Sequence, residues 1–81
     1  MARKKRPPLA KLVRTKRLLA DMSQEEVATK AGVSRSLVAM VEAGGQPSIR
    51  TLKKIATVLG ISPAELSAVL LAEEGKEVEH V

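Results

Sequence analysis

The sequence predicts an all-α domain made of five short helices, and three observations lead to this prediction. Hydrophobic residues recur at intervals of three and four along five separate segments, which is the spacing of one helical face. Serine precedes four of these segments and glycine follows several, and these residue types begin and end helices. The chain has 81 residues and no cysteine, so a single aliphatic core must hold one domain together.

The first helix is expected over residues 9–20, after an N-terminal arm of residues 1–8. Pro7 and Pro8 disfavour a helix that continues backward into this arm. Asp21 follows in the next turn, and aspartate adopts the left-handed conformation more readily than most residues. The buried positions of this helix are expected to include Leu12, Val13 and Leu19.

Two short helices joined through a tight turn are predicted next. Ser23 caps the earlier one, and Glu26 completes a capping box in which hydroxyl and carboxylate each accept from a backbone N–H group. Gly32 stands where the residue after a helix takes a positive φ, at little cost for glycine. Ser34 then caps the later helix. The helices are expected over residues 24–31 and 34–43, with inward positions Val27, Ala28 and Ala31 on the earlier and Leu37, Val38 and Val41 on the later.

Residues 44–47, which include two glycines and a proline, predict a loop before the fourth helix. Ser48 is the expected cap of this helix, which runs to about Leu59. Gly60 then ends it. Its hydrophobic stripe consists of Ile49, Leu52, Ile55, Ala56 and Leu59.

Ser62 and Pro63 predict the start of the fifth helix, as a cap followed by proline at the first helical position. The helix is expected to fray near residues 73–75. We therefore expect a domain over residues 9–73, followed by an acidic tail of residues 74–81. The apolar face of the fifth helix is formed by Leu66, Val69 and Leu70.

Positive charge is concentrated at the N-terminal end of the chain. The whole chain has a net charge of +5, and residues 1–22 alone carry eight basic side chains and one acidic side chain. Residues 23–72 are nearly neutral, whereas residues 73–81 carry a net charge of −3. A basic segment attached to a nearly neutral helical body indicates binding to a polyanion such as nucleic acid. For the arm taken alone, a solubilising disordered tail is the alternative.

Several functional classes lack the residues that they need. The chain has no Phe, Tyr or Trp, which argues against modules that stack single-stranded bases on aromatic rings. With no cysteine and only His80 beside the C-terminus, we expect no metal site and no cofactor. The sequence also lacks a glycine-rich phosphate loop, so we do not expect an enzyme. No apolar run reaches the length of a membrane span and no signal peptide is visible, so we expect a cytoplasmic, nucleoid-associated protein without membrane contact.

Five blocks of sequence follow one another in a characteristic order. They are Val13-Arg14-Thr15-Lys16-Arg17, the stretch from Met22 to Ala28, Ala31-Gly32-Val33-Ser34, Glu42-Ala43-Gly44, and the stretch from Pro47 to Ala56. Together they resemble the Cro-like phage-repressor family of XRE-type helix-turn-helix proteins, over about residues 9–71. The resemblance implies a compact five-helix DNA-binding domain in which the second and third helices form the helix-turn-helix. It also implies a transcriptional regulator, most often a repressor.

An α-helix fits the major groove with its N-terminal residues at the base edges, and the resemblance implies DNA contacts at Gln24, Ser34, Arg35, Ser36 and Met40. Arg35 is the strongest candidate for sequence readout, because its two parallel donors match O6 and N7 of guanine; a phosphate contact is the alternative. Gln24 can bond a phosphate or a neighbouring contact residue, or can be simply a favourable first-turn residue. Ala39 and Met40 can add apolar contact with a thymine methyl group, although Met40 can equally pack inside.

Two further segments offer contacts to the DNA backbone. The loop and the start of the fourth helix present Gly45, Gln46, Ser48 and Arg50, and free N–H groups at a helix N-terminus form a natural phosphate seat. The arm can follow the backbone or enter the minor groove, as the arms of related domains do. Its basic residues are Arg3, Lys4, Lys5 and Arg6.

Arg17 and Glu42 receive a structural assignment from the resemblance. In the family, an arginine and a glutamate at these positions form an ion pair that joins the first helix to the end of the third. The alternative is two unrelated surface charges. If the pair is partly buried, removal of one partner leaves an uncompensated charge and is strongly destabilising.

The leading hypothesis is a sequence-specific transcriptional regulator that binds double-stranded DNA. Its leading form is a repressor that binds a two-fold operator as a homodimer. One domain of this size buries too little surface on DNA for tight specific binding, and a dimer doubles the contacts. The expected dimer surface consists of Leu66, Val69, Leu70 and Leu71. One alternative is an antitoxin that represses its own operon and has a toxin as partner. The other is a protein-interaction helix-turn-helix module that docks on a protein such as a polymerase subunit.

Overall fold

The structure, a computed structural model, describes residues 7–78, with side chains as far as residue 73. Five helices make up this part of the chain, and no strand occurs in it. They are α1 (Pro8–Leu19), α2 (Gln24–Ala31), α3 (Arg35–Glu42), α4 (Ile49–Leu59) and α5 (Pro63–Val78). The prediction of an all-α, five-helix domain is confirmed.

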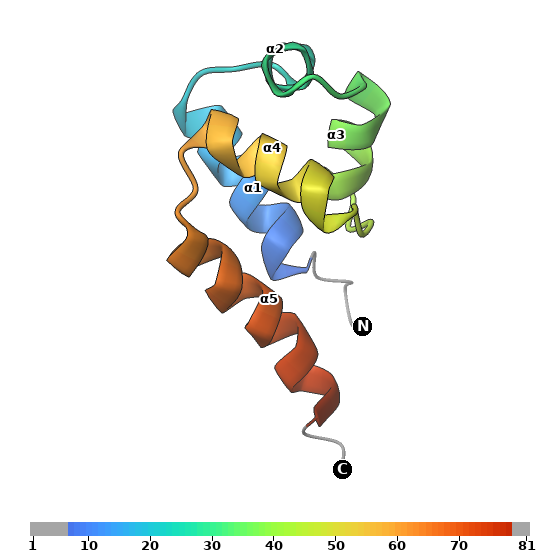
Figure 1. Cartoon of the computed structure of the whole chain (residues 1–81), viewed down its shortest axis with the longest axis vertical. Helices are drawn as coiled ribbons and strands as arrows, with labels where there is room; N and C mark the ends of the chain where they lie inside the picture. The colour runs from blue at the N-terminus through green and yellow to red at the C-terminus, as the bar shows by residue number, and fades with distance from the viewer. Residues whose placement is uncertain (1–6, 79–81) are drawn as a thin grey trace, which may run out of the picture.

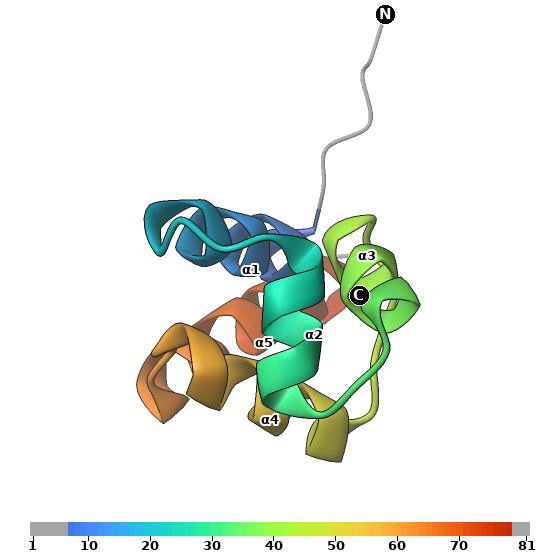
Figure 2. The ribbon, with the colours of Figure 1, turned by 90° about the horizontal axis from the view of Figure 1, so that it is seen from above.

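Helix α1 is the central element, since it contacts α3, α4 and α5. Helix α2 packs on α3 and α4 at one end of the molecule, where Figure 1 shows it above the other helices. Viewed from above in Figure 2, α2 crosses the space bordered by α1, α3 and α4. Helix α5 lies along α1 and extends away from α2 and α3 (Figure 1). The pair α2–α3 therefore lies at one end of the molecule and the far end of α5 at the other.

The core is a single cluster of aliphatic side chains contributed by the first four helices and the segment after α4. Its fully buried members are Leu9, Val13, Val27, Val38, Val41 and Ile55. The α5 residues Leu66, Val69 and Leu70 are half-buried and pack against this cluster from outside. Burial of one such aliphatic side chain stabilises the fold by about 1.5–3 kcal/mol. In the absence of aromatic rings and disulfides, this cluster holds α2 and α3 in place.

Short-range hydrogen bonds begin and end the helices as the sequence predicts. Ser23 and Glu26 form the capping box, with Glu26 N donating to Ser23 Oγ at 3.0 Å and Ser23 N donating to Glu26 Oε1 at 2.8 Å. The Oγ atoms of Ser34 and Ser48 accept from the N–H groups three residues further on, at 3.1 and 3.2 Å. Gly32 ends α2 with a left-handed conformation, φ 72°. The predicted caps and the turn between α2 and α3 are confirmed.

Two predicted core positions are wrong. Leu19 is 79% exposed and Ile49 is 59% exposed. Leu19 follows Val13 by six residues, which is about 1.7 turns at 3.6 residues per turn, so it points about 120° away from Val13 around α1 and off the buried face. Ile49 lies on the apolar stripe of α4, but it is the first residue of that helix, and burial of the stripe begins only at Leu52.

The end of α5 also differs from the prediction. The helix continues to Val78 and does not fray at residues 73–75. Gly75 lies within it, because one glycine costs a helix only about 1 kcal/mol relative to alanine and does not remove a backbone hydrogen bond. Glu73, on the same helix, accepts a hydrogen bond of 2.9 Å from the backbone N–H of Leu9. This bond and a 3.3 Å ion pair between Lys16 and Glu65 join α5 to α1, and the two helices run antiparallel.

No helix within residues 7–78 combines the length and the hydrophobicity that crossing a lipid bilayer requires.

Candidate nucleic-acid interface

The first turn of α3 is presented to solvent by a rigid support. Ser34, Arg35 and Ser36 are exposed, whereas Val38 and Val41 on the opposite face are fully buried. The turn before α3 is closed by a 3.0 Å hydrogen bond from the N–H of Val33 to the carbonyl of Ala28. The hydroxyl of Ser34 accepts from Leu37 N and is therefore engaged in capping. The start of α3 thus offers the side chains of Arg35 and Ser36 to a ligand, together with the O–H donor that capping leaves to Ser34.

Ala39 and Met40 lie one turn further along α3 and are both half-buried. Met40 packs against the core cluster. Its side chain also occupies the space above Gly45, since a Cβ atom added to that glycine would overlap Met40 Sδ and lie 2.7 Å from Cγ. Met40 therefore packs against the core as one of the two alternatives has it, and because the side chain is only half-buried, its contact with DNA stays a prediction.

The loop between α3 and α4 forms a second exposed ridge. Gln46, Ser48 and Arg50 are exposed, and Ser48 Oγ both accepts from Thr51 N and donates to Thr51 Oγ1 at 3.0 Å. The N–H of Gly45 donates to the carbonyl of Met40 at 2.8 Å, so it is not free for a phosphate. The N–H groups of Ile49 and Arg50, which precede Thr51 in the first turn of α4, are the donors that this helix N-terminus can offer to an anion.

Arg17, Glu42 and Gln24 form a polar network where α1, α2 and α3 meet. Arg17 donates to both carboxylate oxygens of Glu42, from Nε to Oε2 at 2.6 Å and from Nη2 to Oε1 at 3.1 Å. Its Nη1 also donates to the carbonyl of Met22 at 2.9 Å. The amide Nε2 of Gln24 donates to Glu42 Oε1 at 3.1 Å. The network therefore attaches the first residue of α2 and the last residue of α3 to α1.

Arg17 and Glu42, the two titratable residues of this network, both stay ionised. Glu42 is 4% exposed, and burial by itself would raise the pKa of its carboxyl group. Hydrogen bonds from Arg17 and Gln24, together with the charges of Arg17 and Arg14, outweigh burial and lower the pKa of Glu42 below its ordinary value. The hydrogen bond to Glu42 raises the pKa of Arg17 against the opposing effect of burial. The pair is consequently ionised at neutral pH, and the ion pair that the resemblance implies between α1 and the end of α3 is present.

Gln24 has two hydrogens on its amide nitrogen, and the bond to Glu42 uses one of them. The amide is therefore held by a neighbouring residue and still has one donor. The bond to Glu42 was not foreseen from the sequence, because it joins residues 18 positions apart on two helices whose relative placement only the packing decides.

The basic residues of the predicted arm, Arg3, Lys4, Lys5 and Arg6, lie outside the described residues. The described chain begins at Pro7, next to the loop between α3 and α4. A Cβ atom on Gly44 would lie 3.2 Å from Pro7 Cδ, and the φ of 107° at Gly44 also suits glycine. Pro7 thus lies beside the loop that follows α3.

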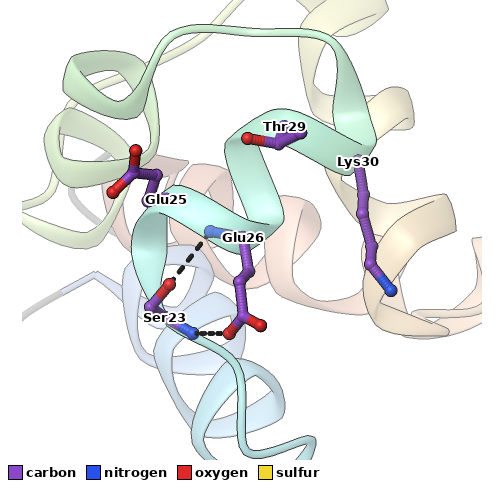
Figure 3. A pocket seen from close by; sticks show the side chains of 5 residues that line it. All are labelled: Ser23, Glu25, Glu26, Thr29 and Lys30. Atoms are coloured by element: carbon purple, nitrogen blue, oxygen red, sulfur yellow. Dashed lines mark hydrogen bonds between the residues drawn. The ribbon is translucent and has the colours of Figure 1, made fainter.

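A hollow of about 240 Å³ lies on the outer side of α2, lined by Ser23, Glu25, Glu26, Thr29 and Lys30 (Figure 3). At one end of it Ser23 and Glu26 are joined by the two hydrogen bonds of the capping box, and Lys30 lies at the other end. Two carboxylates among five lining residues make this surface unsuited to the phosphates of DNA. We therefore place the candidate interface on α3 and the following loop.

Comparison with known proteins agrees with this geometry. A family model described as helix-turn-helix matches residues 13–66, which begin within α1 and end in the first turn of α5. The match covers more than half of the chain and includes the whole of α2, the turn and α3. No curated protein sequence matches the chain significantly. With an exposed first turn on α3, a capped α2 packed against it and this match, the chain belongs to the XRE-type helix-turn-helix family of Cro and the phage repressors, a family of DNA-binding transcription regulators.

Proposed function

We propose that this protein is a transcriptional repressor that binds a two-fold symmetric DNA operator as a homodimer. The observation that carries the proposal is the first turn of α3, where Arg35 and Ser36 are exposed on a helix anchored by Val38 and Val41. A helix held in this way can enter the major groove without losing its support. Because its N-terminal side chains are the ones that reach base edges, Arg35 and Ser36 are the proposed readout residues.

The remaining contacts are assigned to the DNA backbone. Gln46, the Arg50 side chain and the first two N–H groups of α4 would contact phosphates on one side of α3. Gln24 would contact a phosphate on the other side with its second amide hydrogen, while Glu42 holds the first. Contacts of this kind set the orientation of the protein on the duplex, so that Arg35 meets a defined base pair.

The proposed dimer uses α5. Leu71 is 66% exposed, and its neighbours Leu70 and Val69 are half-buried at the edge of the core. A single small domain buries only about 600–1,000 Å² on DNA, whereas tight specific complexes bury about 1,000–2,500 Å². Two copies joined through α5 would provide two α3 helices, and half-sites would then lie about 34–36 Å apart on one face of the duplex.

Selection of bound sites from random duplex DNA tests the proposal most directly. The expected result is an inverted repeat with half-sites about 10 base pairs apart, bound by two copies of the protein. A recovered motif without two-fold symmetry would remove the homodimer from the proposal. Failure to enrich any sequence, together with affinity that does not fall as salt rises, would contradict specific DNA binding itself.

A further inference from the structure

The loop between α3 and α4 is in close contact with Met40 of α3 at Gly45. A Cβ atom on Gly45 would overlap Met40 Sδ and would lie 2.7 Å from Met40 Cγ and 3.1 Å from the Met40 carbonyl oxygen. Gly45 is not among the described residues with a positive φ, so its backbone conformation does not require glycine. The Met40 side chain fills the space beside Gly45, so a Cβ atom there requires either Met40 or the loop to shift.

Met40 is supported from below by the core. Its side chain is half-buried and packs against the buried cluster. Its carbonyl oxygen accepts the N–H of Gly45 at 2.8 Å. On the neighbouring residue of the loop, Pro7 approaches Gly44 closely enough that a Cβ there would lie 3.2 Å from Pro7 Cδ. The loop is therefore in contact with α3 through Met40 and with Pro7, the residue that precedes α1.

The residues that follow this fixed point are polar and exposed. Gln46, Ser48 and Arg50 face solvent, and α4 begins at Ile49. Side chains in such positions add little to the core, so the close contact at Gly45 is not needed to bury them. The contact instead joins α3, to which Met40 belongs, to the segment that leads into the N-terminus of α4.

We propose that Met40 and Gly45 are positioning residues, in which the Met40 side chain seated on the bare backbone of Gly45 sets the offset between α3 and the N-terminus of α4. This inference rests on the proposed DNA binding. With the offset kept, α4 contacts a phosphate while Arg35 and Ser36 meet base edges on the same half-site. A Cβ atom at residue 45 pushes the loop away from Met40, and a hydrogen bond to phosphate weakens steeply once distance and angle depart from their preferred range.

The test is a double-mutant cycle read out on the selected operator duplex and on a random duplex, each over a range of salt concentrations. Gly45→Ala is expected to bind the operator on the order of tenfold more weakly, with a salt slope smaller by about one, because one phosphate contact is lost. Met40→Ala removes the spacer and is expected to show a loss of similar size. In the Met40→Ala protein, Gly45→Ala is then expected to change affinity less than about twofold, since Sδ and Cγ, the two atoms nearest to the new Cβ, are absent.

Gly60→Ala is the matched control. Gly60 has a φ of 70° and open space around the position of a Cβ, so alanine there strains the backbone without displacing a neighbour. This variant is expected to unfold at a lower temperature than the parent, yet to keep the parental affinity and salt slope when binding is measured well below that temperature. The loss in Gly45→Ala can thus be separated from a general loss of stability.

Two results overturn the inference. Gly45→Ala with parental affinity and slope would show that the offset does not depend on this contact. Equal losses on adding Gly45→Ala to the parent and to Met40→Ala would show that Met40 is not the side chain it meets, and this comparison holds even if both variants are less stable. A parent protein that binds neither duplex in a salt-dependent manner would instead overturn the proposed function, before any variant is compared.

Discussion

Arg17 of α1 and Glu42, the last residue of α3, form a two-bond ion pair with N–O distances of 2.6 and 3.1 Å. Both side chains are largely buried: that of Glu42 is 4% exposed and that of Arg17 is 12% exposed. Glu42 also accepts from Gln24 at the start of α2. One buried carboxylate therefore connects three helices, two of which form the helix-turn-helix.

Arg17→Ala is expected to lower the free energy of unfolding by about 3–5 kcal/mol, because Glu42 would remain buried without its cation. Urea unfolding followed by circular dichroism measures this loss. Lys16→Ala is the control: its ion pair with Glu65 is partly exposed and is worth no more than about 1 kcal/mol. Equal stability of the two variants would refute the structural role of the Arg17–Glu42 pair.

The same pair predicts an acid-dependent loss of stability. The pKa of Glu42 in the folded protein lies below its ordinary value of 4.5. The contribution of Glu42 is therefore complete above pH 4.5 and is lost as the pH falls through the lowered pKa. Unfolding midpoints measured from neutral pH into the acid range should fall more steeply for the parent than for Glu42→Gln. That variant is expected to be less stable at neutral pH, and parallel pH profiles for the two proteins would contradict the assignment.

Arg35→Ala is expected to leave the thermal midpoint nearly unchanged, since an exposed first-turn side chain supports no core. It should cost about 1–3 kcal/mol of specific binding and relax the base preference at one position of each half-site. Arg35→Lys is the informative partner variant, because it keeps the charge and loses the two-donor fork, so it should retain affinity for random DNA while losing the preference. Equal weakening by Arg35→Ala on every sequence would reassign Arg35 to a phosphate contact.

Removal of residues 1–6 should weaken binding to operator and random duplex alike. The segment contains four basic side chains, and each phosphate that they neutralise adds about 0.9 to the salt slope. Titrations of the shortened and parental proteins at several salt concentrations measure the difference. Removal of residues 79–81, which include Glu79 and no lysine or arginine, is the matched truncation and should not reduce the slope. If the shortened N-terminus changes neither affinity nor slope, the arm is a solvated tail.

Asp21 is the one non-glycine residue with a positive φ, 58°, among those described. Left-handed backbone costs most L-residues about 1–2 kcal/mol, and glycine avoids this cost while losing more chain entropy on folding. Asp21→Gly is therefore expected to stabilise the domain by a few tenths to about 1 kcal/mol. Asp21→Ala should destabilise it, and the order of the two thermal midpoints provides the check. A glycine variant that unfolds below the alanine variant would contradict the strain at this turn.

The sequence by itself determined the elements whose signals are local. The caps at Ser23, Ser34 and Ser48 and the turn at Gly32 depend on hydrogen bonds and dihedral angles within four residues. Such interactions form in the same way whatever the rest of the chain does. For that reason the limits of α2 agree with the prediction at both ends, and the order and number of helices do too.

Tertiary structure decided which side of each helix is covered. Leu19 and Ile49 have the residue type of core positions, yet both are exposed, because burial depends on whether another helix lies over that turn. The length of α5 likewise departs from the local signal at Gly75. Periodicity shows that one face of a helix is apolar. The local sequence does not show how much of that face a neighbouring helix covers.

The contacts that shape the candidate interface also arise only on folding. Gln24 meets Glu42 across 18 residues, Leu9 meets Glu73 across 64, and Pro7 meets Gly44 across the whole helix-turn-helix. Met40 and Gly45 are close in sequence, yet their contact depends on the packing of the Met40 side chain against the core. Residue type and spacing determined which side chains could bind DNA. Packing between distant segments decided how those side chains are held. The physical reason is that the position of a side chain depends on neighbours that come together only when the chain folds.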